Sequence, residues 1–150
     1  MNGSLSHNAP RPDHRVRRGV IGLLARGTDY LMIQRSPNVP KGGAWCFPGG
    51  HVDLGETSRV AVVRELNEEL GLVVHPTRRL GSIRILDSRH ILVVWQVEQV
   101  SGELRPHAPE VADVRWVPLH GISVISPGLP SNKSVLTLLE SANPRRRGEA

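Results

Sequence analysis

The sequence predicts an α+β fold of the α/β/α sandwich type, in which a mixed β-sheet is flanked by helices. Three observations predict it. Short runs rich in Val, Ile and Leu alternate with turn residues, which is typical of buried strands. Residues 57–70 and 131–141 instead carry apolar residues at helical spacing. A chain of 150 residues that is 39% apolar, with Cys46 as its one cysteine, fits a single core-forming domain without disulfides.

Turn signals separate the expected strands. Gly27–Asp29 divides the first two, and residues 36–43, with two prolines and two glycines, form a loop. Pro48-Gly49-Gly50 is expected to stop the third strand, and Ser101-Gly102 the fifth. We therefore expect strands at residues 20–25, 30–34, 44–47, 73–86, 90–100 and 114–117.

The helix expected at 57–70 ends at Gly71, a residue type favoured at the C′ position. At about 100° per residue, Glu65, Glu68 and Glu69 share one stripe beside the core-facing side. Like charges at this spacing repel by about 0.2–0.5 kcal/mol per pair, and the negative end of the helix dipole adds about 0.3–1 kcal/mol per anion. A divalent cation such as Mg²⁺ or Mn²⁺ would relieve the repulsion. A solvated acidic face is the alternative, and the helix alone favours it.

Neighbouring residues favour the cation. The bent backbone of Pro48-Gly49-Gly50 precedes the helix and can offer a carbonyl to a metal or approach a phosphate closely. Arg64 can pair with Glu65 or with a phosphate oxygen. Glu56, at the helix start, is either an outer ligand or a partner of Arg59 or Arg64.

The formal charge of +5 belongs to the chain ends. Residues 1–18 carry four arginines and one aspartate, residues 141–150 carry three arginines and one glutamate, and the body is neutral. We expect a flexible basic arm at 1–17, a folded domain at 18–141 and a flexible basic tail at 142–150. Nucleic acid is therefore not the expected partner, although a weak RNA contact by the tails is an alternative. The chain lacks the run of about 20 apolar residues that a membrane span needs, and we expect a cytoplasmic protein.

A longer motif surrounds the acidic helix. Gly50, five residues, Glu56, seven residues and then Arg64-Glu65-Leu66-Asn67-Glu68-Glu69-Leu70-Gly71-Leu72 resembles the Nudix box at every specified position. The resemblance extends over about residues 18–141. It implies a Nudix fold and a metal-dependent hydrolase of nucleotide diphosphate linkages.

The likeness is greatest to the MutT-type branch, which hydrolyses oxidised nucleoside triphosphates. Residues 51–57 resemble that branch's loop, and Glu110 matches an extra acid outside the box. Leu129-Pro130-Ser131-Asn132 resembles a segment whose asparagine contacts the purine base. Signatures of dinucleoside polyphosphate, ADP-ribose and NADH hydrolases are missing. The resemblance thus implies cleavage of a nucleoside triphosphate to a monophosphate and pyrophosphate.

The resemblance also implies roles. Glu65, Glu68 and Glu69 would bind Mg²⁺ or Mn²⁺, with the carbonyl of Gly50 or Gly49 as a further ligand and Glu56 in an outer position. One of Glu65, Glu69 or Glu110 would act as general base, and Arg64 would orient Glu65. Substrate contacts are expected from Arg35, Phe47, His51 and Asn132. Each has an alternative: Asn132 could be a helix N-cap, Phe47 a core residue, Arg35 a solvent-exposed strand residue and His51 a loop residue.

Other functions stay open. The substrate could be another nucleotide derivative, such as a CTP-like pyrimidine, a nucleotide sugar or a capped RNA end. A catalytically silent domain that senses a nucleotide is the alternative from another class, but it has no need for this costly acidic cluster. The oligomeric state is open, and a homodimer is one alternative.

Overall fold

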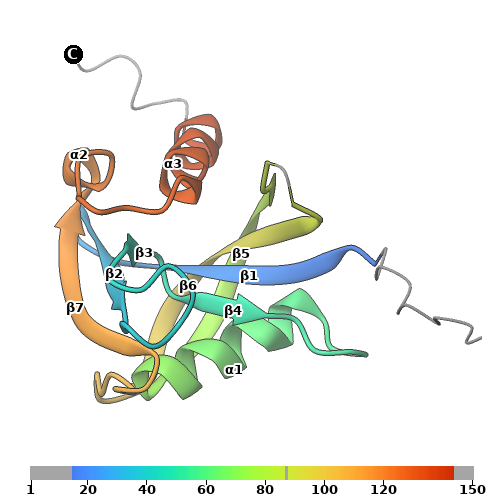
Figure 1. Ribbon diagram of the computed structural model, residues 1–150, viewed down its shortest axis with the longest axis horizontal. Coiled ribbons are helices and arrows are strands. Elements are labelled where there is room, and N and C mark those ends of the chain that lie inside the picture. The colour runs from blue at the N-terminus through green and yellow to red at the C-terminus, as the bar shows by residue number, and fades with distance from the viewer. Residues whose placement is uncertain (1–14, 87, 144–150) are drawn as a thin grey trace, which may run out of the picture.

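The computed structural model describes residues 15–86 and 88–143 of the chain. Its strands are β1 (Arg17–Arg26), β2 (Asp29–Arg35), β3 (Trp45–Cys46), β4 (Gly49–His51), β5 (Leu72–Arg84), β6 (His90–Gly102) and β7 (Val111–Pro118). Its helices are α1 (Ser58–Leu70), α2 (Leu119–Ile122) and α3 (Ser131–Ala142). Figure 1 shows α1 on one side of the strands and α2 and α3 on the other, so the expected α/β/α arrangement is confirmed.

The sheet is mixed and has β1 at its centre. Its strand order is β3-β2-β1-β6-β5, while β4 pairs with β1 and β7 pairs with β2. Strand β1 runs parallel to β6 and antiparallel to both β2 and β4. Along one edge of β1, β2 pairs only at Ala25 and Arg26, whereas β4 pairs at Gly19, Val20 and Ile21. The branching leaves β4 beside the N-terminal half of β1, next to α1.

Alternating side chains of β1 feed two hydrophobic cores, one on each face of the sheet. Val20 and Leu24 point toward α1, and Ile21 and Leu23 point toward α2 and α3. The core under α1 also contains the following helix and strand residues: Ala61, Val62, Leu66, Leu70, Leu72 and Val93. The core under α3 contains Met32, Trp45, Phe47, Val94, Ile122, Val135 and Leu139. No helix in the described ranges has the length and apolar character to cross a membrane.

Local signals define both ends of α1. Thr57 is the N-cap, and its hydroxyl accepts a hydrogen bond from the Val60 amide at 3.2 Å. Gly71 ends the helix in the left-handed conformation with φ of 70°, as its residue type predicted. Leu66 packs directly on Gly22 of β1, where a Cβ atom would lie 2.8 Å from a Leu66 methyl group. This close contact fixes the height of α1 above the sheet.

The structure corrects several element boundaries. Pro48-Gly49-Gly50 was expected to be only a stop, but Gly49 and Gly50 begin β4 because they pair with Ile21 and Val20. The short helix α2 was not expected, since its four residues carry no periodic signal. Strand β7 begins at Val111, and β1 begins at Arg17, which had been placed in the N-terminal arm. Ala142, which had been placed in the C-terminal tail, is the last residue of α3. Residues 1–14 of the arm and the tail from residue 144 lie outside the described residues.

Leu66→Ala tests the packing of α1. Leu66 is fully buried, so we expect the free energy of unfolding to fall by about 2–5 kcal/mol through lost burial and the cavity that remains. Urea unfolding measures the change. Val60→Ala on the same helix is the matched control, because Val60 is 56% exposed and its truncation should change stability by less than about 0.5 kcal/mol. Equal losses in both variants would contradict this packing.

Candidate active site

A cleft of about 390 Å³ opens where β4 meets α1 and the segment before α3. Acidic side chains line one part of it and apolar side chains another. Its lining includes Arg35, Phe47, Gly49, Gly50, His51, Glu65, Glu68, Glu69, Leu92, Glu110, Leu129 and Ser131. The fold thus brings together most of the expected site residues from segments far apart in the sequence, while Glu56, Arg64 and Asn132 are not part of the lining.

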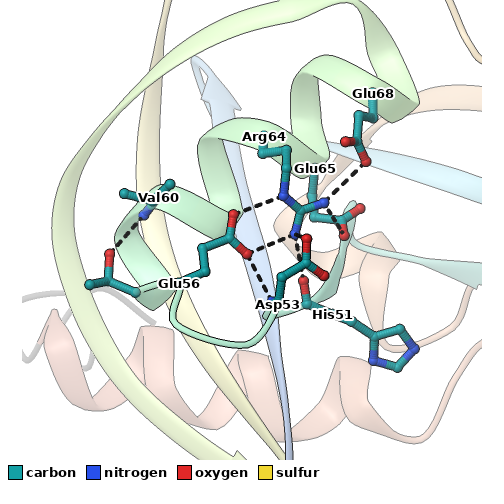
Figure 2. A network of polar contacts seen from close by, with 8 residues as sticks. His51, Asp53, Glu56, Val60, Arg64, Glu65 and Glu68 are labelled. Atoms are coloured by element: carbon teal, nitrogen blue, oxygen red, sulfur yellow. Dashed lines mark hydrogen bonds and ion pairs between the residues drawn. The ribbon is translucent and has the colours of Figure 1, made fainter.

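One guanidinium organises the acids of the cleft (Figure 2). Arg64 donates from Nη1 to Glu65 Oε1 at 3.0 Å and to Glu68 Oε2 at 3.1 Å. From its other side it donates to both oxygens of Glu56, at 2.8 and 2.9 Å. It also donates to the His51 backbone carbonyl at 2.9 Å. Arg64 therefore connects three carboxylates, two on α1 and one in the loop before it, to the end of β4.

Glu56 is the fixed partner of Arg64. Its Oε2 also accepts the Asp53 amide at 2.9 Å, which closes the loop before α1. The Arg64 hydrogen bonds, with that backbone bond, lower the pKa of Glu56 to about 2. Of the two partners that the sequence allowed, Arg59 is not used, because its guanidinium lies over the Trp95 ring at 5.6 Å. Asp53, which the sequence did not single out, lies 3.5 Å from Arg64 Nη2.

Glu65 and Glu69 are almost completely buried, with 9% and 6% of their surface exposed. Burial raises the pKa of Glu65, although Arg64 opposes the shift. Burial, followed by the negative charges of Glu65 and Glu110, raises the pKa of Glu69 to about 8 despite a 3.4 Å hydrogen bond from the Gly49 amide. Burial disfavours the charged form of a carboxylate that has no cation beside it. The Glu65–Glu69 pair therefore destabilises the fold when both groups are ionised.

Glycine is required where β4 passes the carboxylates. A Cβ atom on Gly50 would collide with the Glu65 carboxyl group, and one on Gly49 would collide with the Val20 carbonyl oxygen. Gly50 therefore lets α1 approach β4 closely, and Gly49 lets β4 pair closely with β1, so that Glu65 and Glu69 can reach the β4 backbone. This contact explains physically why a glycine stands at the start of the motif.

The donor set fits a hard divalent cation. Glu65, Glu68, Glu69 and Glu110 all line the cleft and offer carboxylate oxygens, which Mg²⁺ and Mn²⁺ prefer. Across residues 15–86 and 88–143, no three His, Cys, Asp or Glu side chains already converge on one metal position. Figure 2 shows that Arg64 instead holds the oxygens of Glu65 and Glu68. A cation would have to draw them toward Glu69.

The expected substrate residues differ in position. Phe47 is buried and forms part of the cleft wall, packing edge-on against Tyr30 with ring centres 6.5 Å apart. Arg35 lines the cleft and donates to the Pro40 carbonyl at 2.7 Å. His51 is exposed at the cleft edge. Leu92 was missed, because an apolar residue in a strand carries no sign that it faces a cleft.

Asn132 does not line this cleft. It is 3% exposed and faces a separate hollow with Ile122 and Gly128, while its neighbour Ser131 lines the cleft. Its Nδ2 donates to the Trp45 carbonyl at 3.0 Å, and its Oδ1 is buried without a partner among the described residues. Asn132 is not the N-cap of α3, since that position is Pro130. It ties α3 to β3 and keeps one unused acceptor.

These features define a class of protein: an α/β/α domain whose acidic helix and glycine turn form a cleft suited to a cation and an anionic substrate. The NUDIX domain family model matches residues 13–139, so the chain belongs to the NUDIX domain family. The expected family and fold are thereby confirmed.

Two relatives illustrate the similarity to known proteins. "NAD-capped RNA hydrolase NudC" of Pseudomonas aeruginosa strain LESB58 is 33% identical over 138 residues, covering 91% of this chain and 47% of that protein. "Putative 8-oxo-dGTP diphosphatase 2" of Mycobacterium tuberculosis strain H37Rv is 38% identical over 111 residues, covering 66% of this chain and 79% of that protein. The chain thus spans about half the length of the NudC relatives it matches.

Among solved structures, a MutT NUDIX hydrolase from Burkholderia pseudomallei aligns with a TM-score of 0.69 and 27% identity, covering 81% of this chain and 96% of that one. The expectation of a Nudix-type pyrophosphohydrolase agrees with the hydrolase and diphosphatase names of these relatives.

The raised pKa of Glu69 predicts a pH-dependent stability in the absence of metal. The folded-state pKa is about 8 and the ordinary value is 4.5, so the folded protein binds this proton more tightly than the unfolded chain. Stability should therefore be highest below the ordinary value and fall as the pH rises from 4.5 to about 8.

Urea midpoints measured in EDTA across this range should fall less in Glu69→Gln than in the parent protein. Glu140→Gln, an exposed change on α3, should keep the parent slope. Identical slopes in Glu69→Gln and the parent would refute the shift.

Proposed function

We propose that the chain is a metal-dependent hydrolase that cleaves a diphosphate linkage in a nucleotide, with a nucleoside triphosphate as substrate and a monophosphate and pyrophosphate as products. The buried Glu65–Glu69 pair is the observation that carries the proposal. Two carboxylates held in a cleft at a cost in stability are expected at a functional site, because a folded domain alone gains nothing from them.

Glu65, Glu68 and Glu69 would hold Mg²⁺ or Mn²⁺ in this proposal, with Glu56 as an outer residue that acts through Arg64. When bound, such a cation neutralises charge on the phosphates and lowers the pKa of a coordinated water. Of the two candidate carbonyls, that of Gly49 is better placed than that of Gly50. Backbone hydrogen bonds join Gly22 to Pro48 and Val52 to Arg18, two residues to either side of the Val20–Gly50 pair. Because hydrogen-bonded pairs alternate along an antiparallel ladder, the N–H and C=O groups of Gly50 point at β1. Those of Gly49 point away from β1, and its N–H donates to Glu69.

The residues of the chain then have separate tasks. Arg64 positions Glu65 and Glu68 through two hydrogen bonds from one nitrogen. Glu65, Glu69 and Glu110 are the three carboxylates that can take the proton of the attacking water. Glu110 differs from the other two because it is exposed, so it can return the proton to solvent directly. The Arg35 guanidinium, whose charge opposes the rise in the pKa of Glu69, also lines the cleft and is available to a phosphate oxygen.

The apolar part of the cleft suits a base. Phe47 and Leu92 line the cleft from the core under α3, and Leu129 and Ser131 line it from the segment that opens α3. The name of the Mycobacterium tuberculosis relative favours an oxidised purine nucleotide, and the NudC name supports a capped RNA end as the second candidate. A CTP-like pyrimidine or a nucleotide sugar would use the same diphosphate chemistry. The cytoplasmic location and the state of oligomerisation stay predictions.

Glu69→Gln tests the proposal. The substitution keeps the shape of the side chain but removes its charge, so we expect Mg²⁺-dependent turnover of nucleoside triphosphates to fall by at least about 100-fold while the fold survives. Glu68→Gln should do the same, and Glu140→Gln should leave turnover unchanged. Activity is followed as pyrophosphate release, and folding by circular dichroism.

A fully active Glu69→Gln enzyme would refute the metal assignment. Absence of turnover in the parent protein on every nucleotide would favour the silent nucleotide-sensing domain.

Asn132→Ala tests base recognition. If a purine reaches the unused Oδ1 through a shift of α3, KM should rise for 8-oxo-dGTP and change little for pyrimidine triphosphates, because only the former loses a hydrogen bond. Asn132→Asp keeps an acceptor but removes the Nδ2 donor to the Trp45 carbonyl, so it should retain part of the preference at a lower thermal midpoint. If the residue only ties α3 to Trp45, the thermal midpoint will fall and KM will change equally for all substrates.

A further inference from the structure

Two imidazole rings meet at the edge of the catalytic cleft. The rings of His51, on β4, and His90, on β6, lie with their centres 6.4 Å apart and their planes tilted by 38°. His51 lines the cleft, and so does Leu92, two residues along β6 from His90. Figure 2 shows the His51 ring pointing away from Arg64, while the carbonyl of the same residue is bonded to Arg64. His51 thus joins the Arg64 network through its backbone, and its ring lies beside that of His90.

The sheet explains why the two rings approach each other. Strand β1 runs between β4 and β6, so the two histidine backbones are separated by two strand spacings, about 9–10 Å. His51 pairs with Gly19 of β1, and His90 pairs with Arg17. Because side chains alternate along a strand, all four residues share the face of the sheet that carries Ile21 and the core under α3. The rings therefore lean toward each other across β1.

Close packing around Gly19 fixes the strands beneath the rings. A Cβ atom at this position would lie 2.7 Å from a Leu92 methyl group and 3.0 Å from the Gly50 carbonyl oxygen. Glycine is therefore the residue that fits here, and β1 places no side chain at the position that pairs with His51. The register of β4, β1 and β6 thus sets the spacing of the two histidines.

This spacing suits one metal ion shared by both rings. Imidazole nitrogen binds Zn²⁺ at about 2.0–2.1 Å, so two rings on one tetrahedral ion have centres about 5–6 Å apart. Small rotations of the side chains would close the remaining gap. Imidazole is a ligand for Zn²⁺, Ni²⁺ and Cu²⁺, whereas Mg²⁺ and Mn²⁺ prefer carboxylate oxygens. Among the described residues no third His, Cys, Asp or Glu side chain joins the pair, so water would complete the coordination.

We propose that His51 and His90 chelate a transition-metal ion such as Zn²⁺ or Ni²⁺ at the edge of the catalytic cleft. This site is separate from the carboxylates to which the proposed function assigns Mg²⁺ or Mn²⁺. The bound ion would hold the His51 ring beside Leu92 and narrow the cleft at that end, so it would inhibit turnover. Binding of the ion does not depend on the proposed function, and only the inhibition rests on it.

Calorimetric titration with Zn²⁺ in excess Mg²⁺ tests the site. The parent protein should bind one Zn²⁺ ion at least about tenfold more tightly than H90Q or H51Q, because losing a ligand costs no less than losing an outer residue of a metal site. H120Q removes an exposed histidine of α2 and should bind Zn²⁺ like the parent. The electron paramagnetic resonance spectrum of bound Cu²⁺ should show coupling to two imidazole nitrogens in the parent and to one in H90Q. Equal Zn²⁺ affinities of H90Q and H120Q would overturn the site.

Arg17 tests the sign of the bound charge. It pairs with His90 on the same face of the sheet, so its positive charge opposes a cation at the histidines. R17Q should therefore tighten Zn²⁺ binding by about threefold at moderate salt. A site built for an anion would lose affinity for its ligand in the same variant. Weaker binding of Zn²⁺ to R17Q than to the parent would contradict the proposed cation site.

Activity separates this inference from the proposed function. His90 is outside the residues assigned to the reaction, so H90Q should keep the Mg²⁺-dependent turnover of the parent. Zn²⁺ should inhibit the parent at a concentration at least about tenfold lower than it inhibits H90Q. Equal inhibition of the two proteins would overturn the narrowing of the cleft. Absence of turnover in the parent, together with Zn²⁺ binding that depends on His90, would refute only the hydrolase.

Discussion

The Arg64 guanidinium, bonded at once to Glu56, Glu65, Glu68 and the His51 carbonyl, is the interaction on which the site depends. Without it, three acids on or beside one helix would repel one another and the loop before α1 would lose its anchor. With it, Glu56 is held ionised and Glu65 is partly compensated, while Glu69 has no cationic partner of comparable strength. The uncompensated negative charge is therefore concentrated on the buried carboxyl group of Glu69.

The packing of α1 and β4 on the sheet determines the position of this charge. The Leu66–Gly22 contact sets α1 on the sheet, and glycine at positions 49 and 50 lets the β4 backbone pass within reach of Glu65 and Glu69. Strand β4 can occupy this place because β2 diverges from β1 and leaves its N-terminal half unpaired on that edge. The same branching leaves the start of β1 beside the loop between β4 and α1.

Much of this could be predicted from the sequence, and the reasons are specific. Helix α1 was predicted within one residue because its cap, apolar spacing and Gly71 all agree. The stripe of Glu65, Glu68 and Glu69 followed from helical geometry, but its burial did not, since Glu68 is exposed while the other two are not.

Strand β4 was missed because a Pro-Gly-Gly segment has the composition of a turn, and only the tertiary contact with β1 makes it a strand. Asn132 was expected at the substrate, yet the rotation of α3 points it at β3, and no local signal reports that rotation. The basic arm was assigned to the tails because charge was counted along the chain, whereas Arg17 belongs to the sheet.

The central claim is that the buried Glu65–Glu69 pair binds a divalent cation, and the raised pKa of Glu69 implies that a proton leaves when the cation binds. Titration calorimetry with Mg²⁺ at pH 7, repeated in buffers of different ionisation enthalpy, measures this directly because the buffer dependence of the heat counts protons released. With a pKa of about 8 for Glu69, binding should release about one proton, and Glu69→Gln should abolish that release. Mg²⁺ binding with no proton released, or with the same release in Glu69→Gln, would contradict the account.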